Sequence, residues 1–476
     1  MAIGVSSRIL QLIGTLVLTR FIAPAEYDQI LGASICVGVV GQFTSFSFGQ
    51  YLIAKRAPPD VAFQAATLHV GMGLVSMVIV VAFSDPLGRW IDTPHMSDFV
   101  VGFAVANLID RARNIPERVL MRDLNFRTIA TVNGLGEILF TVTAVALAKF
   151  AHWGGDAIIA GTLVRASVTA VLFFAKAPRA EWLAPTRLRG DTVRALFDYG
   201  WPIMVGSLAD KAASRCDSLL VSRLFLPGVM SQYNLAYSLA EMPVSHVAEH
   251  IAEVLMPSFS RMEPEHRRSS VVRAAALMVL VVAPLSVGLG AVAPTLVAAI
   301  FDDRWAGMAP ILSLLGTLMV FHPLPWSAIA FLQAEQNTRL IMIMSFVHAA
   351  VVLTLVAVLG WAGGLLWACV GAGIGFGVYA VLTIVLAAYA TGFSARAYLI
   401  GVTRPLLACV PMFLAVALLR EGLAELGAPA IVSLIAEIIA GGVVYVGAAF
   451  VVAPAGCREL VALARRTLAK RPEPRS

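Results

Sequence analysis

The sequence predicts an all-α membrane protein of about 14 transmembrane helices. Of its 476 residues, 59% are hydrophobic and only 13% are charged, whereas soluble globular chains carry about 25% charged residues. The mean hydropathy is +0.83. The length leaves room for that number of spans of about 20 residues with short connectors. This composition excludes both a soluble enzyme and a disordered chain.

Windows of about 19 residues locate the individual spans. The predicted spans are residues 3–22, 30–53, 61–83, 98–119, 129–150, 157–175, 195–224, 232–255, 271–300, 308–332, 340–359, 364–390, 398–419 and 430–452. Spans four, seven and eight contain enough polar residues to fall below a strict hydropathy threshold. The first apolar run lacks a small-residue cleavage site, so we expect it to remain as a span.

The distribution of basic residues predicts the orientation. The loops on one side of the spans, together with the C-terminal tail, carry most of the 35 Lys and Arg residues. The loops on the other side carry only Arg20, Arg89, Arg223, Arg304 and Arg420. Because Lys and Arg accumulate in cytoplasmic loops, both termini are predicted to lie in the cytoplasm. The same bias explains the net charge of +6 without nucleic acid as a partner.

Two short matches indicate an internal repeat. Residues 18–24 (LTRFIAP) match 221–227 (VSRLFLP), and residues 125–129 (NFRTI) match 337–341 (NTRLI) at nearly the same separation along the chain. Six spans separate the equivalent segments, so both copies share one orientation, as in transporters with parallel repeats. The predicted organisation is an N-lobe (1–176, spans one to six), a cytoplasmic linker (177–194), a C-lobe (195–390, spans seven to twelve), spans thirteen and fourteen (391–455) and a basic cytoplasmic tail (456–476).

Span seven concentrates charges that are costly inside a bilayer. It contains Asp210, Lys211, Arg215 and Asp217, and the two cations share a helix face because they are four residues apart. Two neighbouring cations are useful where a polyanion such as a pyrophosphate binds opposite them. In the alternative interpretation, the two aspartates neutralise them internally.

Other charged residues occur singly or in small groups within spans. Arg8 in span one either lines the same cavity as Lys211 or extends into the headgroups. In span four, Asp110, Arg111 and Arg113 form either an ion network near the cytoplasmic mouth or, for Arg113, a helix-to-loop anchor. Lys149 and Arg165 have no evident partner in the sequence. Of the two, we expect Lys149 to extend outward.

Span eight carries one continuous polar stripe. His246, Glu249, His250 and Glu253 follow the spacing of a single helix face, and Glu241 lies further along the same span. Imidazole and buried carboxyl groups titrate near neutral pH. The stripe therefore predicts either coupling to an ion or a hydrated cavity wall.

Several classes of site are excluded by the pattern. HExxH and CxxC are absent and the five cysteines are scattered, so no metal site is predicted. No phosphate-binding glycine motif is present, so no cofactor is predicted, and we predict no catalytic residue. A membrane polymerase or ligase should carry a sizeable outward loop, whereas the longest predicted one is only about 84–97.

An ordered series of short motifs runs through the chain. They are residues 18–27 (LTRFIAPAEY), 120–127 (LMRDLNFR), 197–202 (FDYGWP), Asp217, 232–237 (QYNLAY), 256–261 (MPSFSR) and 303–310 (DRWAGMAP). This series resembles the Wzx-type polysaccharide and oligosaccharide flippases of the multidrug/oligosaccharidyl-lipid/polysaccharide exporter superfamily. Asp28 and Gln232 depart from the resemblance, because Gly is expected at both positions.

The resemblance implies a MATE-like fold with two six-helix lobes facing a central cavity, two further C-terminal helices and alternating access. It implies transport of undecaprenyl-pyrophosphate-linked oligosaccharide from the inner to the outer leaflet of the bacterial inner membrane. From the polar stripe of span eight we expect ion exchange, with H⁺ or Na⁺ as the candidate coupling ions. A polysaccharide polymerase and glycosyltransferases are candidate partners. We expect Arg8, Arg111, Lys211 and Arg215 to bind the pyrophosphate. The alternatives are a lipid II flippase and a cation-coupled multidrug antiporter; the antiporter should prefer an acidic or aromatic cavity.

Overall fold

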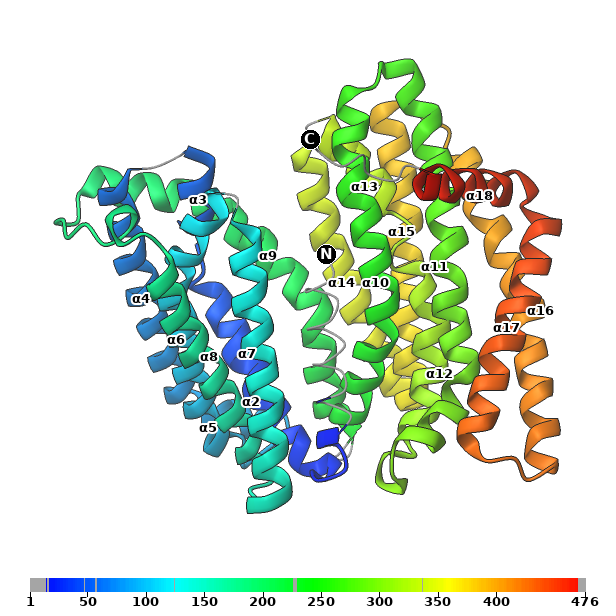
Figure 1. The fold of residues 1–476 in the computed structure, drawn as a ribbon, viewed down its shortest axis with the longest axis horizontal. Coiled ribbons are helices and arrows are strands. Elements are labelled where there is room, and N and C mark those ends of the chain that lie inside the picture. Colours follow the sequence, from blue (N-terminus) through cyan, green and yellow to red (C-terminus); the bar gives the residue numbers. More distant parts are fainter. Residues whose placement is uncertain are drawn as a thin grey trace. The chain divides into compact units, whose positions relative to one another are not determined.

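The computed structural model is nearly all helical in the residues that it describes (Figure 1). These are residues 14, 17–46, 48–55, 58–123, 125–225, 229–335 and 337–469. Only the backbone is described for residues 53–55, 126, 202–203, 206–207, 209–216, 246, 249–250, 252–254, 256–258, 260–261, 264–265, 338 and 463–469. The chain divides into two compact units, an N-terminal unit (Met1–Ser231) and a C-terminal unit (Gln232–Ser476). The predicted border between the two lobes, in the linker 177–194, stays a prediction.

The N-terminal unit is built around α6, which packs against α2, α4 and α8. Its helices are α2 (Pro24–Phe43), α3 (Phe48–Lys55), α4 (Pro59–Ala82), α5 (Ser84–Trp90), α6 (Met96–Arg122), α7 (Phe126–Ala146) with a π-helical turn (Leu147–Ala151), α8 (Asp156–Lys176), a 3₁₀ turn (Arg179–Glu181) and α9 (Gly190–Leu224). Helix α9 closes the unit through contacts with α2, α3 and α4.

The second predicted span is not one helix. The sequence predicts a span over 30–53, but α2 begins at Pro24 and ends at Phe43, and α3 starts only at Phe48. Apolar composition alone did not reveal this break. Its cause is tertiary, because a charged side chain from α6 binds the carbonyl groups that the break exposes.

The C-terminal unit is organised around α11, which packs against α12, α16 and α17. Its helices are α10 (Val229–Arg261), α11 (Pro264–Ile300), a 3₁₀ turn (Asp303–Trp305), α12 (Met308–Leu318), a 3₁₀ turn (Met319–Phe321), α13 (Trp326–Ala334), α14 (Thr338–Gly363), α15 (Leu365–Thr391), α16 (Ala395–Glu425), α17 (Ala430–Val452) and α18 (Pro454–Ala469). Pro323 and Pro325 separate α12 from α13, so the tenth predicted span is interrupted in the middle.

Within the described residues, nine helical segments are long and apolar enough to cross a membrane. Each coincides with a predicted span. The predicted spans four, seven and eight correspond to the helices α6, α9 and α10, which are not in this set. The total of about 14 spans and the orientation of the termini stay predictions.

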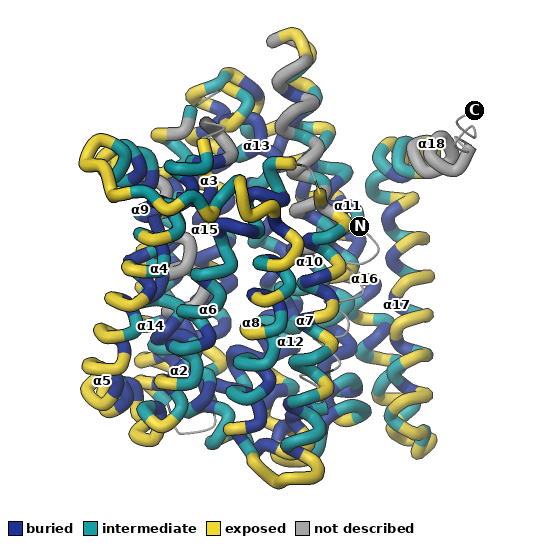
Figure 2. Tube along the Cα trace, turned by 60° about the vertical axis from the view of Figure 1, so that its left-hand side comes forward, coloured by how far each residue is buried: buried dark blue, intermediate teal, exposed yellow. Residues whose placement is uncertain are grey.

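The outer helices expose apolar stripes. On α17, Ile431, Ile435, Ile439 and Val443 follow one helix face, and each is more than half exposed. Exposed positions recur along α17 in Figure 2. A stripe of this kind is an aggregation liability in water but a stable surface against lipid chains. The exposure pattern therefore supports a multi-pass membrane protein.

The local geometry supports the predicted duplication. Asn125 is the N-cap of α7 with φ −81° and ψ 53°, and Asn337 is the N-cap of α14 with φ −82° and ψ 59°. The Oδ1 of each accepts a hydrogen bond at 3.4 Å from the backbone N–H three residues later. Each Asn also donates its own backbone N–H at 2.9 Å to a carbonyl five residues earlier. The matched sequences thus form matched turns.

A second repeated position behaves similarly. Gln29 accepts a hydrogen bond at 3.1 Å from the backbone N–H of His95, the N-cap of α6. Its equivalent Gln232 donates at 3.4 Å to the carbonyl of Arg304, in the turn before α12. Gln29 thus binds the loop before α6, and Gln232 binds the loop before α12. These two helices occupy equivalent places in the predicted repeat, as spans four and ten.

We expect Asn125→Ala and Asn337→Ala each to lower the free energy of unfolding by about 1 kcal/mol, because each removes the acceptor for a helical N–H. Asn→Asp at the same positions keeps the acceptor and should retain most of the stability. Thermal unfolding of the purified protein in detergent measures both effects. Equal losses for the Ala and Asp variants would contradict the capping role.

Candidate functional site

Arg111 holds the break that follows α2. It lies on α6 and is only 7% exposed. Its Nη1 donates to the Thr44 carbonyl at 3.1 Å, and its Nη2 donates to Thr44 Oγ1 at 2.8 Å and to the Gly41 carbonyl. Its Nε donates to Asn107 Oδ1 at 3.2 Å. The last carbonyls of a helix lack intrahelical partners and attract a cation, so Arg111 replaces the bonds that the broken helix loses.

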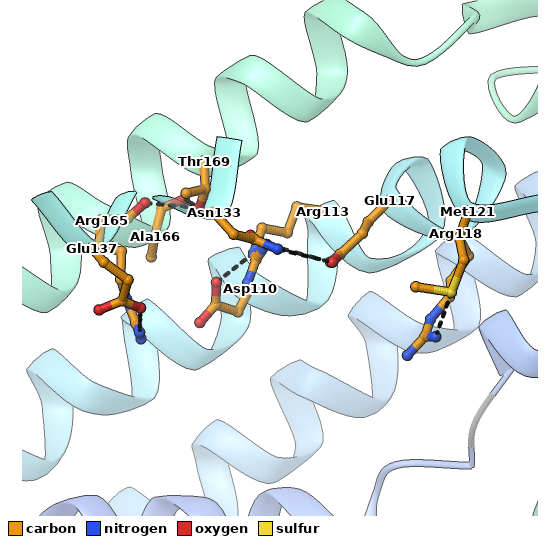
Figure 3. Close-up of polar contacts among 10 residues, drawn as sticks. All are labelled: Asp110, Arg113, Glu117, Arg118, Met121, Asn133, Glu137, Arg165, Ala166 and Thr169. Carbon is orange, nitrogen blue, oxygen red and sulfur yellow. Dashed lines mark hydrogen bonds and ion pairs between the residues drawn. The ribbon is translucent and has the colours of Figure 1, made fainter. Parts of the chain in front are cut away.

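Arg113 points into a different network, which joins α6 to α7 (Figure 3). Its Nε lies 2.7 Å from Asp110 Oδ1, and its Nη1 lies 3.3 Å from Glu117 Oε2 and 3.2 Å from Asn133 Oδ1. The guanidinium carbon also lies 5.4 Å from the centroid of the Phe173 ring. The predicted network therefore contains Asp110 and Arg113, but Arg111 contacts the end of α2 instead.

Arg165 has a partner that the sequence did not reveal. Its Nη1 lies 3.0 Å from Glu137 Oε1, which connects α8 to α7 (Figure 3). The two residues are 28 positions apart, so no helical spacing rule relates them. Lys149 is exposed at the end of its helix, as predicted, with its Nζ 5.3 Å from the centroid of the Phe150 ring.

The loop after α6 is tied to the predicted linker. Arg122 lies 3.0 Å from Glu181 Oε2 and 3.1 Å from Asp123 Oδ1. The pKa of Arg122 is raised: burial opposes its charge, but the hydrogen bonds to Glu181 and Asp123 outweigh burial. This contact anchors the connection between α8 and α9.

The charges of span seven lie on α9. Asp210, Lys211 and Arg215 are part of this helix, but their side chains lie outside the described residues, and so does all of Arg8. Asp217 is 1% exposed, and its Oδ1 accepts the backbone N–H of Ser218 at 2.7 Å.

The polar stripe of span eight lies on α10, which is one helix from Val229 to Arg261. Glu241, on the same helix but outside the stripe, is partly buried. The side chains of the four members of the stripe lie outside the described residues: His246, Glu249, His250 and Glu253. The helical spacing that defines the stripe is therefore confirmed for the backbone, and its coupling role stays a prediction.

Two motif residues make close tertiary contacts. Asp28, where the resemblance leads us to expect Gly, is 2% exposed, and its carboxylate accepts the backbone N–H of Ser231. Gly200, in the motif 197–202, packs against the break after α2, and a β-carbon there would overlap the Phe46 carbonyl oxygen. Asp28 therefore anchors α2, and Gly200 allows α9 to approach the segment before α3 closely.

A half-buried pair of histidines in the C-terminal unit was missed by the sequence analysis. The ring centroids of His322 and His348 are 6.1 Å apart, and His348 stacks on Tyr379 at 4.2 Å. In the described part of the chain, His322 Nδ1 and His348 Nε2 have no hydrogen-bond partner. Isolated histidines 26 residues apart share no motif, so only the packing of α14 and α15 reveals this cluster.

The family follows from comparison with known sequences. A family model described as polysaccharide biosynthesis protein matches residues 17–310. The chain therefore belongs to the polysaccharide biosynthesis protein family. This match confirms the resemblance to Wzx-type proteins that the ordered motifs indicated.

Relatives and solved structures of this family and fold are distant in sequence. The lipopolysaccharide biosynthesis protein WzxC of Escherichia coli strain K12 is 23% identical over 310 residues, which is 64% of this chain and 62% of WzxC. The chain thus covers less than two thirds of that relative. The inward closed conformation of the lipid II flippase MurJ matches 97% of this chain and 99% of MurJ, with a TM-score of 0.76 and 14% identity.

The MATE-like fold is also supported. An inward-facing multidrug resistance MATE family transporter of the MOP superfamily matches 80% of this chain and 94% of the transporter, with a TM-score of 0.62 and 13% identity. At such low identity these matches show the fold alone. The family member described here therefore shares its helical fold with flippases and exporters.

Proposed function

We propose that the protein flips an undecaprenyl-pyrophosphate-linked oligosaccharide from the inner to the outer leaflet of the bacterial inner membrane. The observation that carries this proposal is the family match over residues 17–310, combined with a fold shared with MurJ. The product would enter the assembly of O-antigen, exopolysaccharide or capsule. A polymerase and glycosyltransferases are the partners that such a step requires.

The negative charge of the pyrophosphate opposes the movement of this substrate through the membrane. The pyrophosphate must cross the bilayer core, where an isolated charge costs several kcal/mol. Lys211 and Arg215 share a face of α9 inside the predicted span, where they would offset the substrate charge. During alternating access, Lys211 and Arg215 would stay bound to the pyrophosphate headgroup while the lipid tail stays in the bilayer.

Arg8 and Arg111 complete the proposed set of cations, in different ways. In this structure Arg111 donates hydrogen bonds to Gly41, Thr44 and Asn107. A direct contact between Arg111 and substrate would require these bonds to be exchanged. We therefore assign binding of the pyrophosphate mainly to Lys211 and Arg215, and we assign the positioning of α2 to Arg111.

Ion exchange is the proposed energy source. Glu241, His246, Glu249, His250 and Glu253 would exchange H⁺ or Na⁺ between the two access states, with Asp210 and Asp217 on α9 as further carboxyl groups. Both termini are proposed to lie in the cytoplasm. Collapsing the proton gradient and the sodium gradient separately, in the transport assay below, assigns the ion.

The test begins with a deletion strain. We expect undecaprenyl-linked oligosaccharide to accumulate in the cytoplasmic leaflet and the wild-type gene to reverse this. Lys211→Ala/Arg215→Ala should lower translocation at least about tenfold, because two charge-assisted contacts are lost. Arg223→Ala, at the exposed end of the same helix, is the matched control and should translocate normally.

Two results would contradict parts of the proposal. Normal translocation by the Lys211→Ala/Arg215→Ala protein, at equal abundance in the membrane, would show that these two residues do not bind the pyrophosphate. Drug sensitivity of the deletion strain without lipid accumulation would instead support a multidrug antiporter.

A lipid II flippase is the second candidate, because the MurJ match extends over 97% of this chain. Lipid II carries the same pyrophosphate group, so the same residues would serve. Restoration of growth in a strain depleted of its lipid II flippase would favour this candidate.

A further inference from the structure

A small pocket lies at one end of the C-terminal unit, where α11, α16 and the junction of α17 with α18 meet. Its volume is about 260 Å³. Most of its lining is apolar and includes a wall formed by Ala276, Leu277 and Leu280 of α11. The charged residues Arg273, Arg404 and Glu459 also line it. The pocket therefore combines an apolar wall with basic groups.

The charges of this pocket are not balanced. Arg273 forms an ion pair with Glu459, between Nε and Oε1. Arg404 is exposed, and among the described residues its guanidinium has no hydrogen bond or ion pair. The lining thus has one positive charge in excess, and this charge lies beside the apolar wall.

Helix α18, beside this pocket, has the features of a segment at the surface of a bilayer. Figure 1 shows α18 running across the end of α17 rather than continuing it. Cys457 and Leu460 on α18 pack on the core of the unit, and Arg458 is exposed. A short helix with one apolar face and several arginines is typical of a segment that lies in the headgroup layer. The predicted orientation puts this end of the unit at the cytoplasmic leaflet.

We propose that this pocket binds the phosphodiester of an anionic glycerophospholipid from the cytoplasmic leaflet. The phosphate would lie between Arg404 and Arg273, which present guanidinium donors suited to phosphate oxygens. The glycerol and the first acyl carbons would lie against Ala276 and Leu277. Basic pockets between transmembrane helices at the cytoplasmic side bind such headgroups. This inference does not depend on the transported substrate.

The experiment is lipid titration of the delipidated full-length protein, followed by native mass spectrometry. The probes are phosphatidylglycerol, phosphatidylcholine and soluble glycerol 1-phosphate. We expect the first phosphatidylglycerol to bind at least about fivefold more tightly than phosphatidylcholine, since one arginine near the surface contributes about that factor. Glycerol 1-phosphate should bind far more weakly, because it cannot use the apolar wall.

Four variants sharpen the test. Arg404→Gln should weaken phosphatidylglycerol binding about fivefold, and Glu459→Gln should strengthen it, because Arg273 is then released from its ion pair. Gly401→Leu should block binding without a change in charge, because its side chain enters the pocket, where a β-carbon would lie 3.6 Å from that of Ala276. Arg396→Gln, an exposed arginine on the same helix outside the pocket, is the matched control and should bind like wild type.

Three outcomes would overturn the proposal. They are unchanged binding in Arg404→Gln, equal affinity for phosphatidylglycerol and phosphatidylcholine, and equal affinity for glycerol 1-phosphate, which would indicate a site for soluble phosphate. If Arg404→Gln does not fold, Glu459→Gln still tests the proposal, because a folding defect cannot tighten the binding of phosphatidylglycerol. An affinity in Glu459→Gln at or below that of wild type then contradicts the proposal.

Discussion

Arg111→Ala is expected to lower the free energy of unfolding by about 2–4 kcal/mol. The substitution removes the donors for the carbonyls of Gly41 and Thr44, both at the end of α2. These groups lie inside the predicted span, where water cannot replace the lost partner. Thermal unfolding of the purified protein in detergent, without substrate, measures the effect.

Two further variants distinguish positioning from substrate binding. Arg111→Lys should recover only part of the stability, because one ammonium group cannot reach both carbonyls and Asn107 together. Arg187→Ala, at an exposed position of the linker, should change stability by less than about 0.5 kcal/mol. If Arg111→Ala unfolds like wild type yet fails to translocate lipid-linked oligosaccharide, Arg111 binds substrate and does not hold α2.

Gly200→Val is expected to destabilise the N-terminal unit by about 3 kcal/mol. A β-carbon at Gly200 would overlap the Phe46 carbonyl oxygen, which belongs to the backbone and cannot rotate away. The aromatic rings around this point are closely packed: the Phe46 and Phe197 centroids are 4.7 Å apart. Relief of the overlap would therefore displace α9 from the break after α2.

The measurement is the yield of monodisperse protein together with its thermal unfolding. Gly190→Val is the matched control, because a β-carbon at Gly190 meets no atom within 4 Å. Similar losses in both variants would show that the cost arises from glycine replacement in a helix. Wild-type stability in Gly200→Val would show that α9 does not need this close approach.

The sequence by itself determined the features that depend on neighbouring residues. Apolar content predicted the helices and their membrane environment, and all nine apolar segments of the described chain coincide with predicted spans. The repeat was visible for the same reason, because the turns at Asn125 and Asn337 are formed by bonds within a few residues. The motif series identified the family because motifs are also local.

Tertiary structure alone decided which distant groups meet. The break after α2 is stable because Arg111, 67 residues beyond Thr44, reaches its carbonyl. The partner of Arg165 and the contact between His322 and His348 likewise depend on which helices pack together. Hydropathy and helical spacing report only which face of a helix is apolar, and they do not specify the neighbouring helix. Inside a membrane, polar groups must find partners in the protein, so these contacts shape the site.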